Sequence, residues 1–239
     1  MPKAREHIVV VGGVSGIGLP LARAAHALGC TLTVAGRGAE RAAEIAQSIG
    51  SDVLSCHIDL EDVNSIRAGL AHGPPIDHLV LVPIYSATTT VNNFDVTEAN
   101  RVLHIKLTGY LEAVHAALPR LRPTSSIVLF GGMAKSRPYP NSTMITVANA
   151  GIVGIMNTLA VELAPIRVNS ISPGLVGDSP KWAAIVKKGE NPVVKAIAAR
   201  TPTRRFATTA DVIHAVFFLL DNHSVNGHDL EINGGYLLM

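Results

Sequence analysis

The chain has 239 residues, of which 48% are hydrophobic and only 16% are charged. This length and composition exclude a disordered chain, a collagen-like protein and a coiled coil, and they are typical of one α/β domain over residues 1–239. A net charge of +2 and an aromatic content of 4% are low for a nucleic-acid-binding or membrane-binding surface. We therefore expect neither nucleic acid nor a membrane as a partner.

The two cysteines and the N-terminal segment bear on the compartment. Cys30 and Cys56 have no metal-ligand spacing and form no disulfide framework, which favours a reducing compartment and no metal site. The first residues lack the apolar core of a signal peptide. The uncharged stretch 138–161 contains too many Asn, Ser and Thr residues for a membrane-spanning helix. We predict a cytoplasmic protein.

Short apolar runs alternate with longer helical patterns along the whole chain. In chain order, this alternation predicts strands at 7–11, 31–35, 53–57, 76–82, 127–130, 167–172 and 229–232, and helices at 16–28, 39–49, 61–71, 94–121, 143–163 and 210–220. The first strand is apolar at every position from Ile8 to Val11, as in a parallel sheet that is buried on both faces. The pattern predicts a doubly wound α/β fold with about seven parallel strands and helices on both faces.

A glycine-rich turn, Gly12-Gly13-Val14-Ser15-Gly16-Ile17-Gly18, directly follows the first predicted strand. Glycines let a backbone turn tightly and approach a pyrophosphate, which then lies at the N-terminal amides of the following helix. We predict that Gly12, Ser15, Gly16, Ile17 and Gly18 bind a dinucleotide. The alternative is a tight turn with no ligand.

Two further strand ends concern the adenosine half of such a ligand. Gly36 and Arg37 follow the second strand, where an acidic residue is usual for NAD and an arginine can pair with the 2′-phosphate of NADP. We therefore favour NADP(H) over NAD(H), the alternative being an arginine in a solvated helix start. Asp59 and Leu60 follow the third strand and are assigned to the adenine, although Asp59 equally suits the N-cap of the next helix.

Together with Leu107-Thr108-Gly109, the segment 167–174 and the closing Asn233-Gly234-Gly235, these features resemble the short-chain dehydrogenase/reductase family over nearly the whole chain. The resemblance implies a Rossmann-type NAD(P)-binding domain that acts on a small-molecule substrate. It also implies a homo-oligomer, a tetramer or a dimer, in which the helices 94–121 and 143–163 contact partner subunits. Finally, it assigns Pro173, Gly174 and Val176 to the cofactor site and residues 177–205 to a loop and helices that cover the substrate.

The resemblance further implies a catalytic set of Asn, Ser, Tyr and Lys, and this sequence differs at all four positions. In register with Ala150-Gly151, the four positions hold Lys106, Gly132, Ile145 and Asn149. Ile145 has no proton to donate, and Gly132 has no hydroxyl to polarise a carbonyl group. The usual hydride-transfer mechanism of the family therefore lacks its groups for proton transfer.

The Asn and Lys of the family set are exchanged in this sequence, which suggests a substitute. We hypothesise that Lys106 is the acid/base or oxyanion-stabilising residue, with a pKa lowered by burial, and that Asn149 bonds a ribose hydroxyl. The alternative is a Lys106 side chain that reaches the surface. Tyr139, which lies between two prolines near the expected substrate entrance, is a third candidate and is better suited to a gate.

The fourth predicted strand ends in Pro83 and Ile84, where the family has small and polar residues. Pro83 removes an amide donor and Ile84 adds bulk, so we expect a narrower nicotinamide site. Asp178 stands where a threonine near the carboxamide is expected. The segment 181–205 is rich in lysine and arginine, which favours an anionic or carrier-linked substrate, or else a solvated helix face.

Three functions remain open on the sequence alone. The first is a divergent NADP(H)-dependent oxidoreductase that acts on a small organic substrate by a non-standard route. The second is a catalytically silent scaffold or regulatory subunit, which requires no cofactor. The third is a non-redox enzyme, such as a cyclase, isomerase or lyase, that uses the same pocket for proton transfer.

Overall fold

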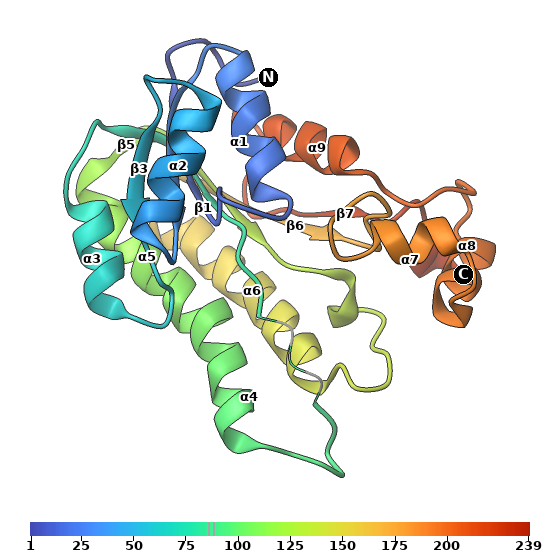
Figure 1. Ribbon diagram of the computed structural model, residues 1–239. Helices are drawn as coiled ribbons and strands as arrows, with labels where there is room; N and C mark the ends of the chain where they lie inside the picture. The colour runs from blue at the N-terminus through green and yellow to red at the C-terminus, as the bar shows by residue number, and fades with distance from the viewer. Residues whose placement is uncertain (86, 88) are drawn as a thin grey trace.

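Seven parallel strands form one sheet in the order β3-β2-β1-β4-β5-β6-β7 in the computed structural model, which describes residues 1–85, 87 and 89–239 (Figure 1). The strands are β1 His7–Val11, β2 Thr31–Gly36, β3 Leu54–His57, β4 Ile76–Leu81, β5 Leu121–Phe130, β6 Arg167–Pro173 and β7 Asp229–Ile232. The strand order reverses between β1 and β4. In doubly wound sheets, ligands bind at the carboxyl ends of the strands beside such a reversal.

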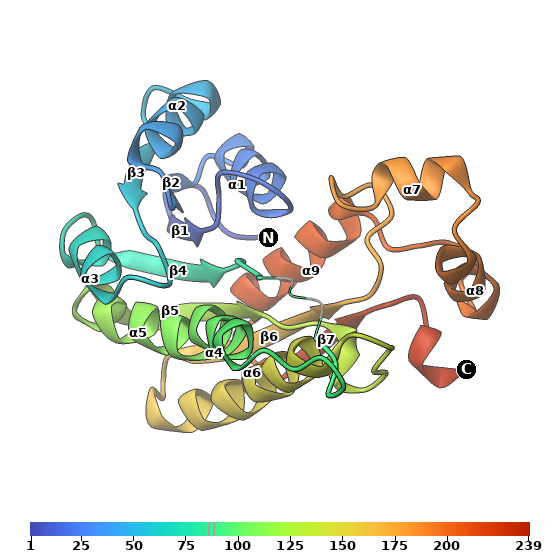
Figure 2. The same cartoon turned by 60° about the horizontal axis from the view of Figure 1, so that its bottom comes forward.

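Helices cover both faces of the sheet, as predicted (Figure 2). They are α1 Gly18–Ala27, α2 Ala39–Ile49, α3 Val63–Ala71, α4 Val96–Leu103, α5 Gly109–Ala117, α6 Thr143–Glu162, α7 Ala183–Lys188, α8 Pro192–Arg200 and α9 Thr209–Asp221. The helices α1, α2 and α9 pack on one face, and α3, α5 and α6 pack on the other. The short helices α7 and α8 stand apart from these layers, near the C-terminus (Figure 2).

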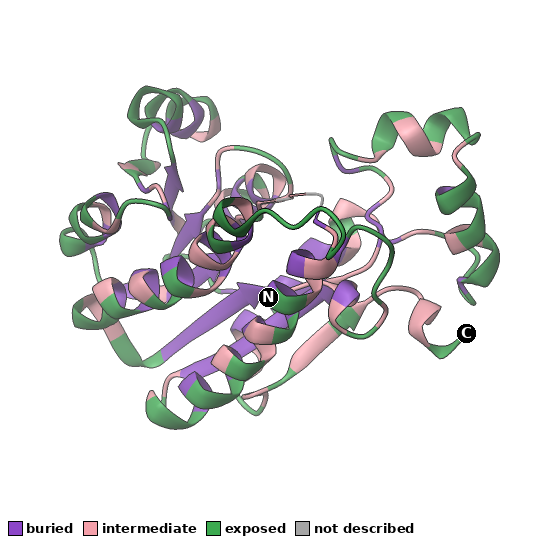
Figure 3. Cartoon of the chain, turned by 90° about the horizontal axis from the view of Figure 1, so that it is seen from below, coloured by how far each residue is buried: buried purple, intermediate pink, exposed green. Residues whose placement is uncertain are grey.

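The two-sided burial explains why the central strands are apolar throughout. Ile8 and Val10 belong to the core under α1 and α9, whereas Val9 and Val11 belong to the core under α5 and α6. All four side chains are at most 1% exposed, and each contributes about 1.5–3 kcal/mol of burial free energy. The central strands are accordingly buried, whereas exposed residues lie on the outer sides of the helices and in the loops (Figure 3).

The helix predicted over 94–121 is wrong in its detail. It is divided into α4, a π-helical turn η1 at His104–Thr108, α5 and a 3₁₀ turn at Leu118–Arg120. The strand predicted at 127–130 begins earlier, at Leu121. The apolar pattern did not reveal this start, because the first residues of the strand are partly or fully exposed and show no apolar run. The π-helical turn matters for the site, since such turns change the direction of side chains inside a helix.

The helix α6 is long and apolar enough, by length and composition alone, to cross a membrane, and no other helix in the described ranges meets that test. Part of its apolar surface is explained by packing within the protein, while Val147 and Val161 are exposed. Ile152, Met156, Leu159 and Ala160 belong to the core beneath β1, β4 and β5. We therefore interpret α6 as a core helix of the α/β fold.

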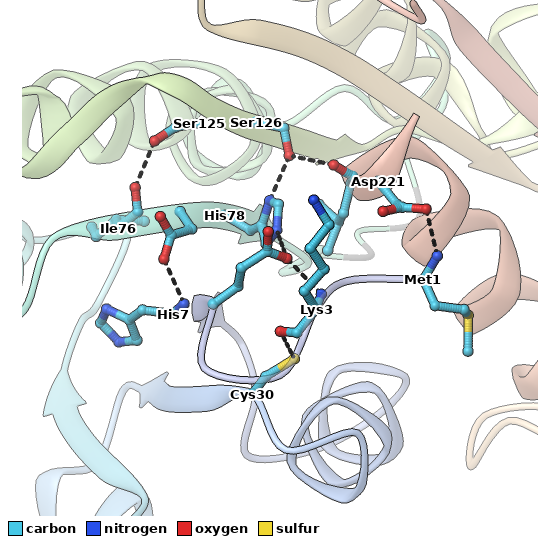
Figure 4. Close-up of polar contacts among 12 residues, drawn as sticks. Met1, Lys3, His7, Cys30, Ile76, His78, Ser125, Ser126 and Asp221 are labelled. Atoms are coloured by element: carbon cyan, nitrogen blue, oxygen red, sulfur yellow. Dashed lines mark hydrogen bonds and ion pairs between the residues drawn. The ribbon is translucent and has the colours of Figure 1, made fainter. Parts of the chain in front are cut away.

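A polar cluster lies at the opposite edge of the sheet, where the strands begin (Figure 4). His78 on β4 contacts the Ser126 hydroxyl through Nδ1 at 2.8 Å and the Glu6 carboxylate through Nε2 at 3.1 Å. Ser125 donates to the carbonyl oxygen of Ile76 at 2.6 Å. These bonds join the N-terminal segment to β4 and β5 and satisfy polar groups that the sheet buries.

Candidate active site

The glycine-rich turn has the backbone that its sequence predicts. Gly12 has φ +81° and Gly16 has φ +56°, a region that side-chain-bearing residues rarely adopt. A Cβ atom on Gly18 would lie 2.1 Å from the carbonyl oxygen of Gly12, so α1 can approach the turn only with a glycine there. Ser15 is exposed, and Ile17 at the N-cap of α1 leaves the first helical amides without a side-chain cap.

Arg37 follows β2 directly and is exposed. It forms no ion pair with any residue in the described part of the chain. The residue before it, Gly36, is closely packed, since a Cβ on Gly36 would lie 2.5 Å from the Val14 side chain. The guanidinium is therefore available for an anionic group beside the glycine-rich turn.

The residues after β3 give one correction. The N-cap of α3 is Asp62, whose side chain accepts a hydrogen bond from the amide of Asn64, and the cap predicted at Asp59 is wrong. The Asp59 carboxylate instead accepts from the Glu61 amide at 3.0 Å. Leu60 is 4% exposed, and its carbonyl oxygen would lie 2.6 Å from a Cβ on Gly109. Gly109 thus lets the start of α5 approach the predicted adenine-binding segment.

Lys106 lies in the middle of the π-helical turn η1 and is only 2% exposed. The alternative in which its side chain reaches the surface is therefore wrong. Burial lowers the pKa of its amine to about 7, as the sequence-based hypothesis requires. No carboxylate among the described residues pairs with it, and its Nζ atom lies 5.3 Å from the centre of the Tyr110 ring.

Tyr110 was missed by the sequence analysis, although its position four residues after Lys106 places both on the same helical face. Its side chain is fully buried. Its hydroxyl lies 2.9 Å from the carbonyl oxygen of Leu81 and 2.8 Å from that of Pro83, so that it donates to the end of β4. This contact connects the Lys106 segment to the edge of the sheet where strand order reverses.

Gly132 and Asn149 are in direct contact. A Cβ on Gly132 would lie 2.8 Å from Nδ2 of Asn149, so the amide side chain occupies the space that a serine would need. Asn149 is 3% exposed, and its Oδ1 atom is buried with no hydrogen-bond partner among the described residues. Ile145 lies one turn earlier on α6 and is 8% exposed. These three residues therefore form a tightly packed wall with one unsatisfied acceptor.

The Lys106 segment and α6 are neighbours. A Cβ on Gly151 of α6 would lie 2.8 Å from Cδ2 of Leu107, so this glycine allows η1 to pack closely against the helix that carries Ile145 and Asn149. Tyr139 is not part of this packing. It is 51% exposed in the loop before α6, where its amide donates a hydrogen bond to the Ser142 hydroxyl oxygen at 3.0 Å.

Pro83 approaches the glycine-rich turn from β4. A Cβ on Gly12 would lie 2.9 Å from Cγ of Pro83, which leaves no space between the two segments. Ile84 is 54% exposed, so its side chain does not fill the core. Pro83 therefore packs on Gly12, and the narrowing of the nicotinamide site stays a prediction.

The end of β6 carries the remaining predicted cofactor residues. Pro173 ends the strand, and Gly174 donates its amide to the carbonyl oxygen of Ile232 at 2.9 Å. Val176 is 4% exposed and forms an isolated bridge with Ala207. Asp178 accepts hydrogen bonds from the amide and the hydroxyl of Thr209, at 2.7 and 2.9 Å, so it fixes the start of α9.

The segment 177–205 buries little of its surface. The helix α7 has no buried residue, and α8 buries only Val194. Lys187, Lys188 and Lys195 are all exposed or partly exposed on these helices. This loose packing is compatible with a segment that moves to admit a ligand.

Comparisons with known proteins agree with this geometry. A family model described as enoyl-(acyl carrier protein) reductase matches residues 12–237. The chain is 30% identical to trans-4-hydroxycyclohexanecarboxylate dehydrogenase of Sinomonas cyclohexanicum, over 97% of this chain and 93% of that protein. It is 29% identical to 3-oxoacyl-[acyl-carrier-protein] reductase of Homo sapiens, over 96% and 97%. A solved structure of a short chain dehydrogenase/reductase family protein is 28% identical, with a TM-score of 0.87 and complete coverage of both chains.

Proposed function

Because the chain belongs to the short-chain dehydrogenase/reductase family of oxidoreductases, we propose that it is an NADP(H)-dependent oxidoreductase in which Lys106 replaces the tyrosine as the proton-transferring residue. The observation that carries this proposal is the burial of Lys106, which is 2% exposed and has no carboxylate partner in the described ranges. An amine that is protonated only in part near neutral pH can both give and take a proton.

The residues present fit a dinucleotide. The exposed Ser15, the positive-φ glycines and the uncapped start of α1 offer amide donors for a pyrophosphate. Arg37 offers a guanidinium that forms no ion pair within the described ranges and could bind a 2′-phosphate, which favours NADP(H). The Oδ1 atom of Asn149 needs a donor, and a ribose hydroxyl would satisfy it. When bound, the nicotinamide would supply or accept a hydride.

The proton side of the reaction falls to Lys106. In the reduction of a ketone, its ammonium would give a proton to the developing alkoxide; in the oxidation of an alcohol, the neutral amine would take that proton. Burial holds the pKa of this amine at about 7, so both forms are populated near neutral pH. Ile145 and Gly132 contribute no proton donor and leave this role to the amine.

The relatives indicate a substrate class. Two are named for a hydroxycyclohexanecarboxylate and for a 3-oxoacyl group on a carrier protein. Both names describe an alcohol or ketone in a molecule that also has a carboxyl or acyl group. The lysines and arginines of 181–205 would favour such an acidic or carrier-linked compound. We therefore propose a secondary alcohol or ketone that bears a carboxyl or acyl group.

Calorimetric titration with NADPH and, separately, NADH tests the cofactor. We expect the wild-type protein to bind NADPH more tightly, and the Arg37→Ala variant to lose that preference by about tenfold or more. The Arg41→Ala variant is the matched control, because Arg41 lies on α2 and is already paired with Glu44 at 3.3 Å. The absence of binding to either nucleotide would contradict the proposal and would favour the scaffold or the cofactor-free enzyme.

Turnover tests the role of Lys106. With a carbonyl substrate found by screening, the Lys106→Met variant should lose at least a hundredfold in kcat while it keeps its affinity for NADPH. In the wild type, the rate of reduction should fall as the pH rises through about 7, because the Lys106 ammonium that donates the proton becomes deprotonated. A Lys106→Met variant that retains wild-type turnover would refute this role.

A further inference from the structure

Lys106 is the one lysine among the described residues that is buried, and its surroundings contain no acid to hold its charge. Lys135 offers a direct comparison within the same chain. Its amine lies 3.0 Å from the Asp229 carboxylate and 2.6 Å from that of Glu231, and these bonds raise its pKa. Lys135 is therefore fixed as an ammonium, whereas burial pushes Lys106 toward the neutral amine.

A neutral primary amine in apolar surroundings has a second kind of chemistry besides proton transfer. It is a nucleophile toward the carbon atom of aldehydes and ketones, and desolvation is one of the ways in which proteins activate lysines for this reaction. The product, a protonated imine, is a cation. At Lys106 that cation would lie near the face of the Tyr110 ring, whose centre is 5.3 Å from Nζ and whose quadrupole attracts positive charge.

We propose that Lys106 forms imines with aldehydes and ketones and thereby exchanges the hydrogens on the adjacent carbon with solvent, without a nicotinamide. This activity goes beyond the proposed oxidoreductase function. It uses the buried Lys106 amine beside the Tyr110 ring and requires no part of the dinucleotide site. The substrate class is a carbonyl compound with at least one hydrogen on the carbon next to the carbonyl group.

The reaction needs no oxidant or reductant. The neutral amine nitrogen of Lys106 bonds to the carbonyl carbon, one hydrogen of the amine and one proton from solvent pass to the carbonyl oxygen, and this oxygen leaves as water. A cationic C=N bond remains. A proton then leaves the adjacent carbon for water, and its electron pair forms a C=C bond that neutralises the nitrogen. Reprotonation from solvent followed by hydrolysis releases the carbonyl compound and one proton and restores the neutral amine.

The neighbouring positions favour this chemistry. Gly132 and Ile145 carry no acidic or hydroxyl group, and no carboxylate among the described residues forms an ion pair with the Lys106 amine. Asn149 offers a buried oxygen, Oδ1, that has no partner within the described ranges. A bound molecule with a donor group would satisfy this atom, which lies on the helix that packs against the Lys106 segment.

Trapping with cyclohexanone and sodium cyanoborohydride, in the absence of any nicotinamide, tests imine formation. At pH 7 we expect one cyclohexyl group on Lys106, detected by peptide mass spectrometry and by the loss of tryptic cleavage after this residue. The Lys135→Met variant should be labelled as the wild type is, and Lys106→Met should not be labelled. Labelling of exposed lysines such as Lys3 with Lys106 unlabelled would overturn the proposal.

Hydrogen exchange gives a second readout on the same proteins. In D₂O, wild-type protein should speed the deuteration of cyclohexanone at the carbons next to its carbonyl group at least tenfold over Lys106→Met, as followed by proton NMR. Lys106→Arg keeps a cation but cannot form the imine, so it should also be inactive. If Lys106→Met does not fold, the Lys106→Arg variant and the site mapping of the wild type decide the question. Equal exchange in wild type and Lys106→Arg would contradict the proposal.

The outcomes are separable from those for the oxidoreductase function. NADPH binding without labelling of Lys106 would overturn the imine proposal alone. Labelling of Lys106 in a protein that binds neither NADPH nor NADH would overturn the oxidoreductase proposal alone.

Discussion

At the scale of single residues, three of the four substituted positions lie in two pairs, Gly132 with Asn149 and Lys106 with Tyr110. Gly132 is small because the Asn149 amide occupies the space beside it, with Nδ2 2.8 Å from the position of a Cβ. Lys106 lies beside Tyr110 on the turn that packs against α6. The sequence could show that each position departs from the family pattern. It could not show the contacts, because they join residues far apart in the chain through the tertiary fold.

Because Gly132 and Asn149 are in contact, placing the family's serine at position 132 should destabilise the folded protein. We expect Gly132→Ser to lower the free energy of unfolding by about 1–3 kcal/mol, because the new side chain overlaps the Asn149 amide. Asn149→Ala should remove most of that penalty, so a double-mutant cycle by urea unfolding should give a coupling above about 1 kcal/mol. Additive effects of the two substitutions would contradict the contact.

At the scale of elements, the glycine-rich turn and the strand pattern were well predicted, because they depend on local backbone geometry and on burial on both faces. The strands β1 and β7 have the predicted bounds. The division of the long helix at η1 was not predicted, since a π-helical turn leaves no compositional signal between α4 and α5. The early start of β5 was also missed, because its first residues are exposed and polar.

The same element gives a prediction at Tyr110. This side chain joins α5 to the end of β4, because its single hydroxyl hydrogen is shared between the carbonyl oxygens of Leu81 and Pro83. Tyr110→Phe should lower the free energy of unfolding by about 1–3 kcal/mol, because it leaves buried carbonyl groups without a donor. Tyr236→Phe, whose ring lies on the partly exposed C-terminal segment, is a suitable control. A Tyr110→Phe variant as stable as the wild type in urea would show that these bonds are dispensable.

At the scale of the whole molecule, the two edges of the sheet have different roles. The carboxyl edge carries the glycine-rich turn, Arg37 and the Lys106 segment, which together form the candidate site. The opposite edge carries the cluster of His78, Ser126 and Glu6, whose hydrogen bonds hold the N-terminal segment on the sheet (Figure 4). The polar groups at the carboxyl edge are thus available to a ligand, whereas those of the cluster at the opposite edge are hydrogen-bonded within the protein.

The opposite edge should make the protein sensitive to acid. Burial lowers the pKa of His7 and of His78 below the usual value of 6.5, so both are neutral in the folded protein. As the pH falls below about 6.5, the unfolded chain takes up protons first, and the free energy of unfolding falls until the folded pKa values are reached. His78→Gln should show a smaller fall in urea unfolding between pH 6.5 and 5 than the wild type. An equal fall would assign the acid sensitivity to other groups.

The outer surface of α5 and α6 should form a subunit interface, as the family resemblance implies. A shallow groove of about 350 Å³ there is lined mainly by apolar and small residues, among them Leu111, Gly154 and Ile155. No atom lies within 4 Å of a Cβ built on Gly154, so the fold itself tolerates a side chain at this position. Gly154→Arg should therefore shift the sedimentation coefficient from oligomer to monomer with little loss of secondary structure. A wild-type monomer, or an unchanged oligomer in Gly154→Arg, would contradict an interface on this surface.

Both proposed roles of Lys106 depend on the charge state of its buried amine, and that state can be measured directly. Protein labelled with carbon-13 at the lysine ε-carbons can be titrated by NMR, and the resonance absent from Lys106→Met identifies Lys106. We expect this resonance to titrate near pH 7, while the pKa of Lys135 is raised above its usual value by its bonds to Asp229 and Glu231. A Lys106 amine that titrates near 10.5, as an ordinary lysine does, would contradict both its role in proton transfer and its role as a nucleophile.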